Sequence, residues 1–161
     1  MLQIALENKL PMVNLSQSGG GNLKFSGDTF AESGILYAMQ CQLSAAGIPQ
    51  ITVVHGSATA GGAYQPTLSD YLILVRKQST MYLAGPPLLK AATGEIATEE
   101  DLGGAEMHSE IAGTNDYLAE NDADGIRIAR EITQKLGWNK NRPLQANTCL
   151  LYTSPSPRDR Y

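Results

Sequence analysis

The sequence predicts an α/β fold, because short apolar runs alternate along it with stretches of helical spacing. The run at residues 51–54 is almost entirely β-branched and is typical of a buried strand. With 161 residues and a hydrophobic fraction of 42%, the chain can bury one globular core. No internal repeat or low-complexity linker interrupts it before the C-terminal tail, so one domain is expected.

Each element is predicted from its local pattern. Gly47 and Pro49 stop the second helix, Pro86 opens a later one because a first turn tolerates proline, and Thr98 can cap the next. The apolar residues Ile35, Leu36, Met39 and Leu43 fit one face of the second helix. The expected strands are residues 11–15, 51–54, 71–75 and 81–83, and the expected helices are 2–6, 28–46, 63–69, 86–92, a short one from 98 and 122–136.

Composition excludes several classes of function. The net charge is −4 and no basic run is present, which argues against a nucleic-acid partner. No apolar run reaches the roughly 18 residues of a membrane span, and residues 1–9 lack the features of a signal peptide. Cys41 and Cys149 form no disulfide framework, so a reducing compartment is expected. Neither His55 nor His108 has a metal-ligand set around it in the sequence, so no metal site is expected.

Two glycine-bearing loops carry the candidate chemistry. One follows the first strand, at residues 16–21, and the other lies at residues 56–62 between a strand and a helix. Glycine lets a backbone N–H approach a ligand closely, and two such groups aimed at one oxygen form an oxyanion hole. The second loop also precedes a helix N-terminus, which favours negative charge. The alternative for either loop alone is a tight turn without a catalytic role.

Residues 55–71 resemble the strand–loop–helix signature of the crotonase superfamily, which ends in an aspartate such as Asp70. The resemblance implies a ClpP/crotonase-like ββα superhelix and two backbone amides that polarise an acyl-CoA thioester. Hydratases of the superfamily use two glutamates, and here Tyr64 and Pro87 stand in their places. Because a water-adding enzyme needs such acid–base groups, the hydratase machinery is absent while the oxyanion loops remain.

The chain is most similar to the carboxyltransferase (beta) subunit of biotin-dependent acyl-CoA carboxylases. The resemblance extends nearly from Ala5 to Trp138, and its version of residues 86–95 is similar to the methylcrotonyl-CoA and geranyl-CoA branch. The sequence departs from the family's usual pattern at residues 12–14 and 24–37 and at Gly21, His55 and Ala58. These departures affect the identity of the acyl group more than the class of reaction. The matching segments are ALEN (5–8), SGG (18–20), SAAGIPQ (44–50), TAGGAY (59–64), GPPLLKAATGE (85–95) and LGGA (102–105).

The resemblance implies the site residues. Catalytic amides are expected from Gly19 or Gly20 and from Gly61 or Gly62. Contacts to the coenzyme A thioester are expected from four further residues: Gly21, Ala63, Tyr64 and Lys90. For Lys90 the alternative is an exposed lysine on a helix without a binding role.

The resemblance also implies a reaction. Carboxybiotin, carried by a biotin carrier and made by a biotin carboxylase subunit, decarboxylates at the carboxyltransferase. The biotin enolate then removes a proton from the acyl-CoA, and the resulting carbanion captures CO₂. No protein side chain need act as the base, and the subunit supplies positioning and oxyanion stabilisation. Full-length subunits of the family form a homo-oligomer (a hexamer), with sites shared between two subunits, so this chain alone is expected not to turn over.

Domain boundaries and location follow from the same comparison. Residues 1–140 are expected to be part of the N-terminal carboxyltransferase domain, residues 141–148 are unassigned, and residues 149–161 resemble a translated sequencing adapter. An ordinary disordered tail is the alternative for the last segment. The family implies a bacterial cytoplasmic location, or the mitochondrial matrix in a eukaryote.

Two rival functions stay open at this point. A crotonase-type enoyl-CoA hydratase or isomerase predicts activity on enoyl-CoA without biotin. A non-catalytic CoA-binding fragment predicts affinity for CoA without any carboxyl transfer.

Overall fold

The computed structural model describes residues 1–21 and 26–139, and it confirms the α/β class. A parallel sheet forms the middle layer in the order β1-β2-β3-β5, with β4 beside the C-terminal half of β2. The expected artefact at residues 149–161 and the unassigned residues 141–148 lie outside the described residues. The strands are β1 (Met12–Ser18), β2 (Gln50–Thr59), β3 (Tyr71–Val75), β4 (Thr80–Tyr82) and β5 (Tyr117–Ala119).

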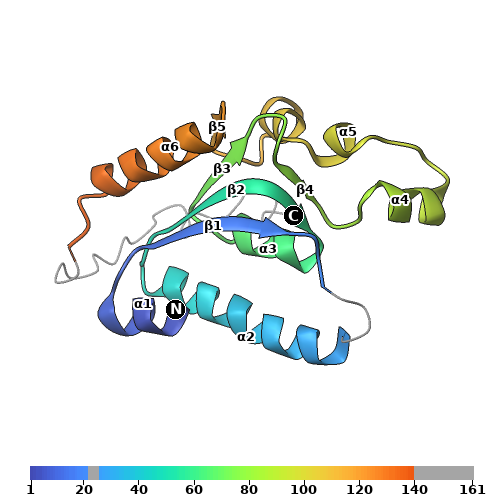
Figure 1. Ribbon diagram of the computed structural model, residues 1–161. Coiled ribbons are helices and arrows are strands. Elements are labelled where there is room, and N and C mark those ends of the chain that lie inside the picture. The colour runs from blue at the N-terminus through green and yellow to red at the C-terminus, as the bar shows by residue number, and fades with distance from the viewer. Residues whose placement is uncertain (22–25, 140–161) are drawn as a thin grey trace, which may run out of the picture.

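Helices cover both faces of the sheet, as Figure 1 shows: α6 lies on one face, and α3 lies on the other with α1 and α2 beyond it. The helices are α1 (Leu2–Asn8), α2 (Ser26–Ala45), α3 (Gly61–Thr67), α4 (Pro86–Thr93), α5 (Glu99–Gly103), the π-helix η2 (Met107–Ala112) and α6 (Asp122–Lys135). Within the described part of the chain, no helix combines the length and apolarity needed to cross a bilayer.

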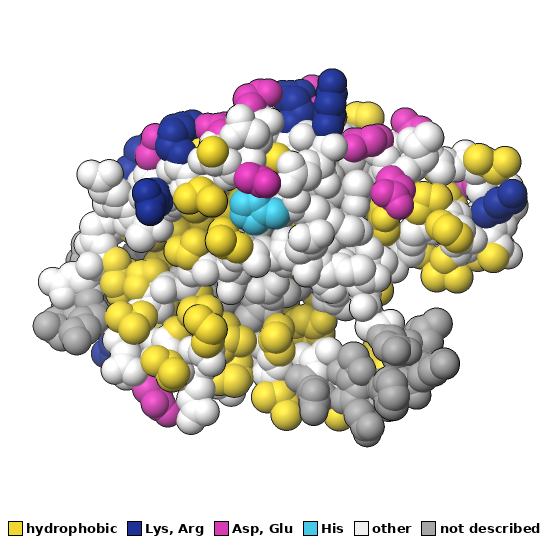
Figure 2. Space-filling view, in the orientation of Figure 1, with side chains coloured by type: hydrophobic (Ala, Val, Ile, Leu, Met, Phe, Trp, Pro, Cys, Tyr) yellow, Lys and Arg dark blue, Asp and Glu magenta, His cyan; other side chains and the backbone are white. Residues whose placement is uncertain are grey.

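The surface is divided by side-chain type. Figure 2 shows charged side chains of both signs along the top of this face, over α6 and the neighbouring turns, and hydrophobic ones lower down, over α1, α2 and β1. On α2 the expected apolar face is only partly buried: Leu43 is fully buried, whereas Ile35 is 65% exposed. The periodicity was therefore a correct sign of the helix but a poor guide to which of its residues form the core.

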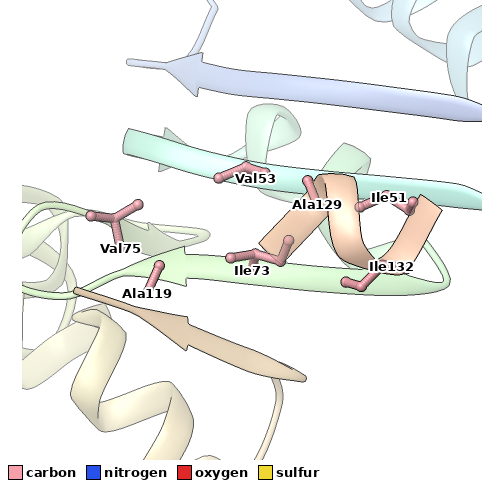
Figure 3. Packing of buried hydrophobic residues seen from close by; sticks show 7 residues of the cluster. All are labelled: Ile51, Val53, Ile73, Val75, Ala119, Ala129 and Ile132. Carbon is pink, nitrogen blue, oxygen red and sulfur yellow. The ribbon is translucent and has the colours of Figure 1, made fainter. Parts of the chain in front are cut away.

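The sheet core follows from the alternation of side chains along the strands. Ile51 and Val53 of β2 face α6 and pack there with Ile132, as Figure 3 shows. Val54 and Ala58 point to the opposite face and pack with Ala63 of α3. β2 is buried on both faces from Gln50 to Val54, whereas from His55 onward every second residue is partly exposed.

Two predicted strands are too short. β1 continues through Ser18 and β2 through Thr59, so strand takes up half of the expected loop at residues 16–21 and more than half of the one at residues 56–62. The extra length of β2 is stabilised by pairing on both sides, since Ala58 pairs with Ser18 of β1 and with Met81 of β4. The π-helix η2 and the short strand β5 were not expected, because neither has a clear periodic pattern in the sequence.

The LGGA segment owes its glycines to packing. Gly103 ends α5 against β4, and a Cβ atom built on it would lie 2.4 Å from the carbonyl oxygen of Met81. A Cβ on Gly104 would lie 2.7 Å from the backbone oxygen of Glu100. Gly103 therefore lets α5 approach β4 closely, and Gly104 leaves room for the backbone of Glu100 at the end of α5. The cap that Thr98 provides by accepting from the Asp101 N–H fixes the other end of α5.

We expect Gly103→Ala to lower the free energy of unfolding by about 2 kcal/mol, since the backbone of β4 must shift to admit the methyl group. The matched control is Gly34→Ala in α2, where a Cβ atom meets nothing within 4 Å. That control should stabilise the chain by up to about 1 kcal/mol through helix propensity. Urea denaturation measures both, and equal effects of the two substitutions would contradict the packing argument.

Candidate active site

A cavity of about 640 Å³ lies between α2, the start of α3 and the segment that leads from β4 into α4. Figure 2 shows the molecule hollowed at its right-hand side, below α4. Its walls combine glycine backbone with apolar side chains. The lining residues are Gly19, Gly20, Gly21, Phe30, Ser33, Gly34, Tyr37, Thr59, Ala60, Gly61, Leu83, Ala84, Gly85, Pro87 and Leu88.

The cavity brings the two glycine clusters together. Gly19, Gly20 and Gly21 come from the end of β1, and Gly61 comes from the start of α3. Gly62 borders an adjoining cavity of about 390 Å³, which shares Gly20, Gly21 and Gly61 with the first. Residues that are some forty positions apart in the sequence therefore meet because β1 and β2 are parallel neighbours that end at the same edge.

The start of α3 offers unpaired amide donors. Gly61 and Gly62 are its first residues, so their N–H groups have no acceptor within the helix, whereas the Ala63 N–H donates to the Ala60 carbonyl at 3.0 Å. A Cβ atom on Gly62 would lie 2.6 Å from Ser18 Oγ, so this position must be glycine for β1 and α3 to meet.

The β1 side of the site is partly occupied by its own side chain. The Gly20 N–H donates to Ser18 Oγ at 3.3 Å, and Gly20 has a φ of +94°, a conformation that favours glycine. A substrate oxygen would have to displace Ser18 to accept from Gly20, which leaves Gly21 as the neighbouring amide that borders both cavities.

The connection between β2 and α3 is strained. Ala60 has φ 53° and ψ −120°, a conformation that side chains rarely adopt, and it lines the larger cavity. Its N–H donates to the Tyr82 carbonyl at 3.0 Å, which ties the turn to β4. Backbone strain of this kind costs of order 1–3 kcal/mol and gathers at functional sites, where surrounding structure holds it in place.

Three of the expected CoA contacts lie away from the cavity walls. Ala63 is buried in the core beneath the sheet. Tyr64 is 50% exposed and packs its ring against Tyr37, with centroids 5.7 Å apart. Lys90 is exposed on α4, about one turn beyond the lining residue Pro87. Of the four, Gly21 alone borders a described cavity.

The apolar walls were missed from the sequence. Phe30, Ser33, Gly34 and Tyr37 lie at helical spacing on the face of α2 that borders the cavity. The spacing of these residues can be read from the sequence. The neighbouring stripe on α2 has larger aliphatic side chains, however, and it alone was predicted as a face of the helix, the one toward the core. Leu83 and Leu88 complete the wall from the β4–α4 segment, and nothing local to them marks them as pocket residues.

The histidines have structural partners. His108 contacts Met81 O through Nε2 at 2.8 Å and Thr114 Oγ1 through Nδ1 at 2.6 Å, which joins η2 to β4. His55 Nδ1 lies 2.6 Å from Asp122 Oδ1, so β2 is tied to the start of α6. Hydrogen bonds from His55 and then Gln78 lower the pKa of the Asp122 carboxyl. Among the described residues, no group of three or more His, Cys, Asp or Glu gathers as a metal site.

We expect Asp122→Asn to lower the thermal midpoint at neutral pH, because a carboxyl with a lowered folded pKa stabilises the folded state above its unfolded pKa of about 3.9. That contribution is lost as the pH falls through the lowered folded value, so wild type and variant should converge in acid. Melting curves from pH 7 to pH 2 measure this, with exposed Glu95→Gln as the control. A gap that stays constant down to pH 2 would contradict the assignment.

Ala60→Gly should raise the free energy of unfolding by about 1 kcal/mol, because relief of the positive φ exceeds the added entropy of the unfolded chain. Ala58→Gly is the matched control two residues earlier, at a fully buried position inside β2. It should destabilise by about 1 kcal/mol or more. Chemical denaturation compares the two, and a destabilising Ala60→Gly would show that the turn is not strained.

Comparison with known proteins shows which family the chain is similar to. The sequence profile of the carboxyl transferase domain matches residues 1–159. The 3-methylcrotonyl-coenzyme A carboxylase beta1 subunit of Mycobacterium tuberculosis is 46% identical over 152 residues, which cover 89% of this chain and 29% of that protein.

Solved structures similar to this chain belong to the same group of enzymes. The beta subunit of P. aeruginosa geranyl-CoA carboxylase is 57% identical, with a TM-score of 0.79 over 90% of this chain and 27% of that one. The transcarboxylase 12S hexamer, solved with hydrolysed methylmalonyl-CoA, is 32% identical, with a TM-score of 0.76 over 81% of this chain and 26% of that one. The chain thus spans under a third of the length of these relatives. Its crotonase-like fold, as a partial domain, is the one expected from the sequence. The chain belongs to the carboxyl transferase domain family, whose members similar to it include beta subunits of biotin-dependent acyl-CoA carboxylases.

Proposed function

We propose that this chain forms the acyl-CoA side of a carboxyltransferase site, where backbone amides stabilise the enolate of an acyl-CoA that receives a carboxyl group from carboxybiotin. The observation that carries the proposal is the meeting of the two glycine clusters at one cavity. Support also comes from the family membership and from the hydrolysed methylmalonyl-CoA that the transcarboxylase relative was solved with.

The amides of Gly61 and Gly62 are the proposed donors from the α3 side, with Gly20 or Gly21 as the donor from the β1 side. Removal of a proton from the acyl group moves negative charge onto the thioester oxygen. Donors aimed at that oxygen are worth most at this moment, because they stabilise the charge as it forms and the helix dipole of α3 favours it. The carboxyl group comes from carboxybiotin on a partner domain, and the acyl-CoA exchanges one proton for it.

The walls of the cavity favour carboxyl transfer over hydration. Among the described side chains that border either cavity, none is an aspartate, glutamate or histidine. A hydratase requires such a group within hydrogen-bond reach of water and substrate. A carboxyltransferase does not, since carboxybiotin itself yields the base.

The acyl group proposed for the site is branched and unsaturated, as in methylcrotonyl-CoA or geranyl-CoA. Phe30, Leu83 and Leu88 offer an apolar wall to it, and relatives named for these two substrates are 46% and 57% identical. Lys90, about one turn along α4 from Pro87, is proposed to meet a phosphate of CoA. A biotin carboxylase partner and a hexameric assembly of complete subunits are likewise proposed from the relatives.

The test replaces the matching segment of the P. aeruginosa geranyl-CoA carboxylase beta subunit with this chain and adds the biotin-carrying partner. We expect ATP-dependent fixation of labelled bicarbonate into 3-methylcrotonyl-CoA or geranyl-CoA. Gly20→Ala should lower kcat about a hundredfold, because the residue cannot keep its φ of +94° and the neighbouring amides move.

Gly113→Ala is the matched control, since Gly113 also has a positive φ but lies at the end of η2, outside the lining of both cavities. It should reduce stability and leave kcat within about twofold. An assembled chimera that binds acyl-CoA but transfers nothing would support the non-catalytic alternative. Hydration of crotonyl-CoA without the biotin partner would support the hydratase alternative.

A further inference from the structure

Tyr37 connects helix α2 to the glycine turn. Its hydroxyl donates to the Gly61 carbonyl oxygen at 2.5 Å, across 24 positions in the sequence. A Cβ atom on Gly61 would lie 2.9 Å from the same hydroxyl oxygen, so the tyrosine presses directly against this backbone. Tyr37 also borders both cavities, at the wall that they share.

The bond to Gly61 acts on the amide of Gly62. The carbonyl of one residue and the N–H of the next belong to the same planar trans peptide unit and point in opposite directions. Fixing the Gly61 carbonyl therefore fixes the direction of the Gly62 N–H. That N–H lies in the first turn of α3, where no helical carbonyl accepts from it.

Two contacts hold this peptide from different sides. Ser18 of β1 abuts Gly62, at the distance where a Cβ atom would collide with its Oγ. Tyr37 holds Gly61 from α2, and its ring is in turn supported by the tilted ring of Tyr64 at 5.7 Å. Without the tyrosine hydroxyl, the peptide keeps its packing against Ser18 but loses the bond that sets its rotation.

We infer that Tyr37 is a positioning residue, whose hydroxyl aims the Gly62 amide at the thioester oxygen of a bound acyl-CoA. The inference rests on the proposed function, because it presumes that this amide is an oxyanion donor. It assigns the hydroxyl a role separate from the ring, which lines the cavity as an apolar wall. Tyr37→Phe should therefore keep the apolar wall of the cavity but lose the hydrogen bond that orients the Gly62 amide.

The test uses the 161-residue chain and two probes that differ by one oxygen. They are 3-methylcrotonyl-CoA and the thioether S-prenyl-CoA, which has the same carbon skeleton without the carbonyl oxygen. Calorimetry gives a dissociation constant for each probe with wild type, Tyr37→Phe and Tyr117→Phe. The last variant removes a hydroxyl from β5, outside both cavities.

We expect wild type to bind the thioester about tenfold more tightly than the thioether, as one well-aimed hydrogen bond allows. Tyr37→Phe should bring that ratio close to one while its affinity for the thioether stays within about twofold of wild type. Tyr117→Phe should keep the wild-type ratio. The unchanged thioether affinity shows that the cavity is still folded.

The other outcomes each overturn the inference, and they are distinguishable. A Tyr37→Phe chain that keeps the wild-type preference shows that the hydroxyl does not aim the amide, and the proposed function stands. An equal loss for both probes shows a purely structural tyrosine. If the wild-type chain binds both probes alike, or binds neither, then no amide donates to the thioester oxygen. In that case the proposed function of this chain is wrong as well as the inference.

Discussion

The arrangement of this molecule depends on the burial of β2 between two layers of helices. Ile51 and Val53 face α6, and Val54 and Ala58 face α3, so neither face of the strand can shift without exposing core. β1 on one side and β3 with β4 on the other satisfy its backbone. The strand ends at Thr59, and the strained conformation of Ala60 turns the chain into α3. A rigid strand is what allows the turn to remain strained, and the turn delivers Gly61 and Gly62 to the cavity.

A second consequence is that backbone and side chains contribute to the cavity in different ways. The backbone of the glycine clusters is placed by parallel strands and is insensitive to side-chain identity. The apolar wall, in contrast, is built from α2 and from the segment before α4, with Phe30, Tyr37, Leu83 and Leu88. Residues 24–37 are also among the positions where the sequence is expected to depart from the usual pattern of its family. A scaffold with constant amides and a variable wall can keep one reaction while the acyl group changes.

Much of the fold could be predicted from local pattern. The strand at Tyr71–Val75, the helix that proline opens at Pro86 and the cap at Thr98 all appear where the sequence indicates them. The extension of β2 through Thr59 could not be foreseen, because His55, Gly56 and Ser57 favour a loop until pairing with β1 and β4 is known. The meeting of the glycine clusters was expected from resemblance, whereas the role of Tyr37 depends on a contact between residues 24 positions apart. No local pattern encodes such a contact.

The parallel pairing of β1 with β2 also governs when the fold can form. Met12 pairs with Gln50 and Ser16 with Val54, so the whole of α2 lies between partners. A parallel pair cannot close through a hairpin and must wait for its crossover. During synthesis on a ribosome, β1 therefore emerges before β2, and the two strands cannot pair until the chain beyond Val54 has left the exit tunnel. Loop closure on this scale makes the first strand pair a slow step relative to the helices, which form within microseconds.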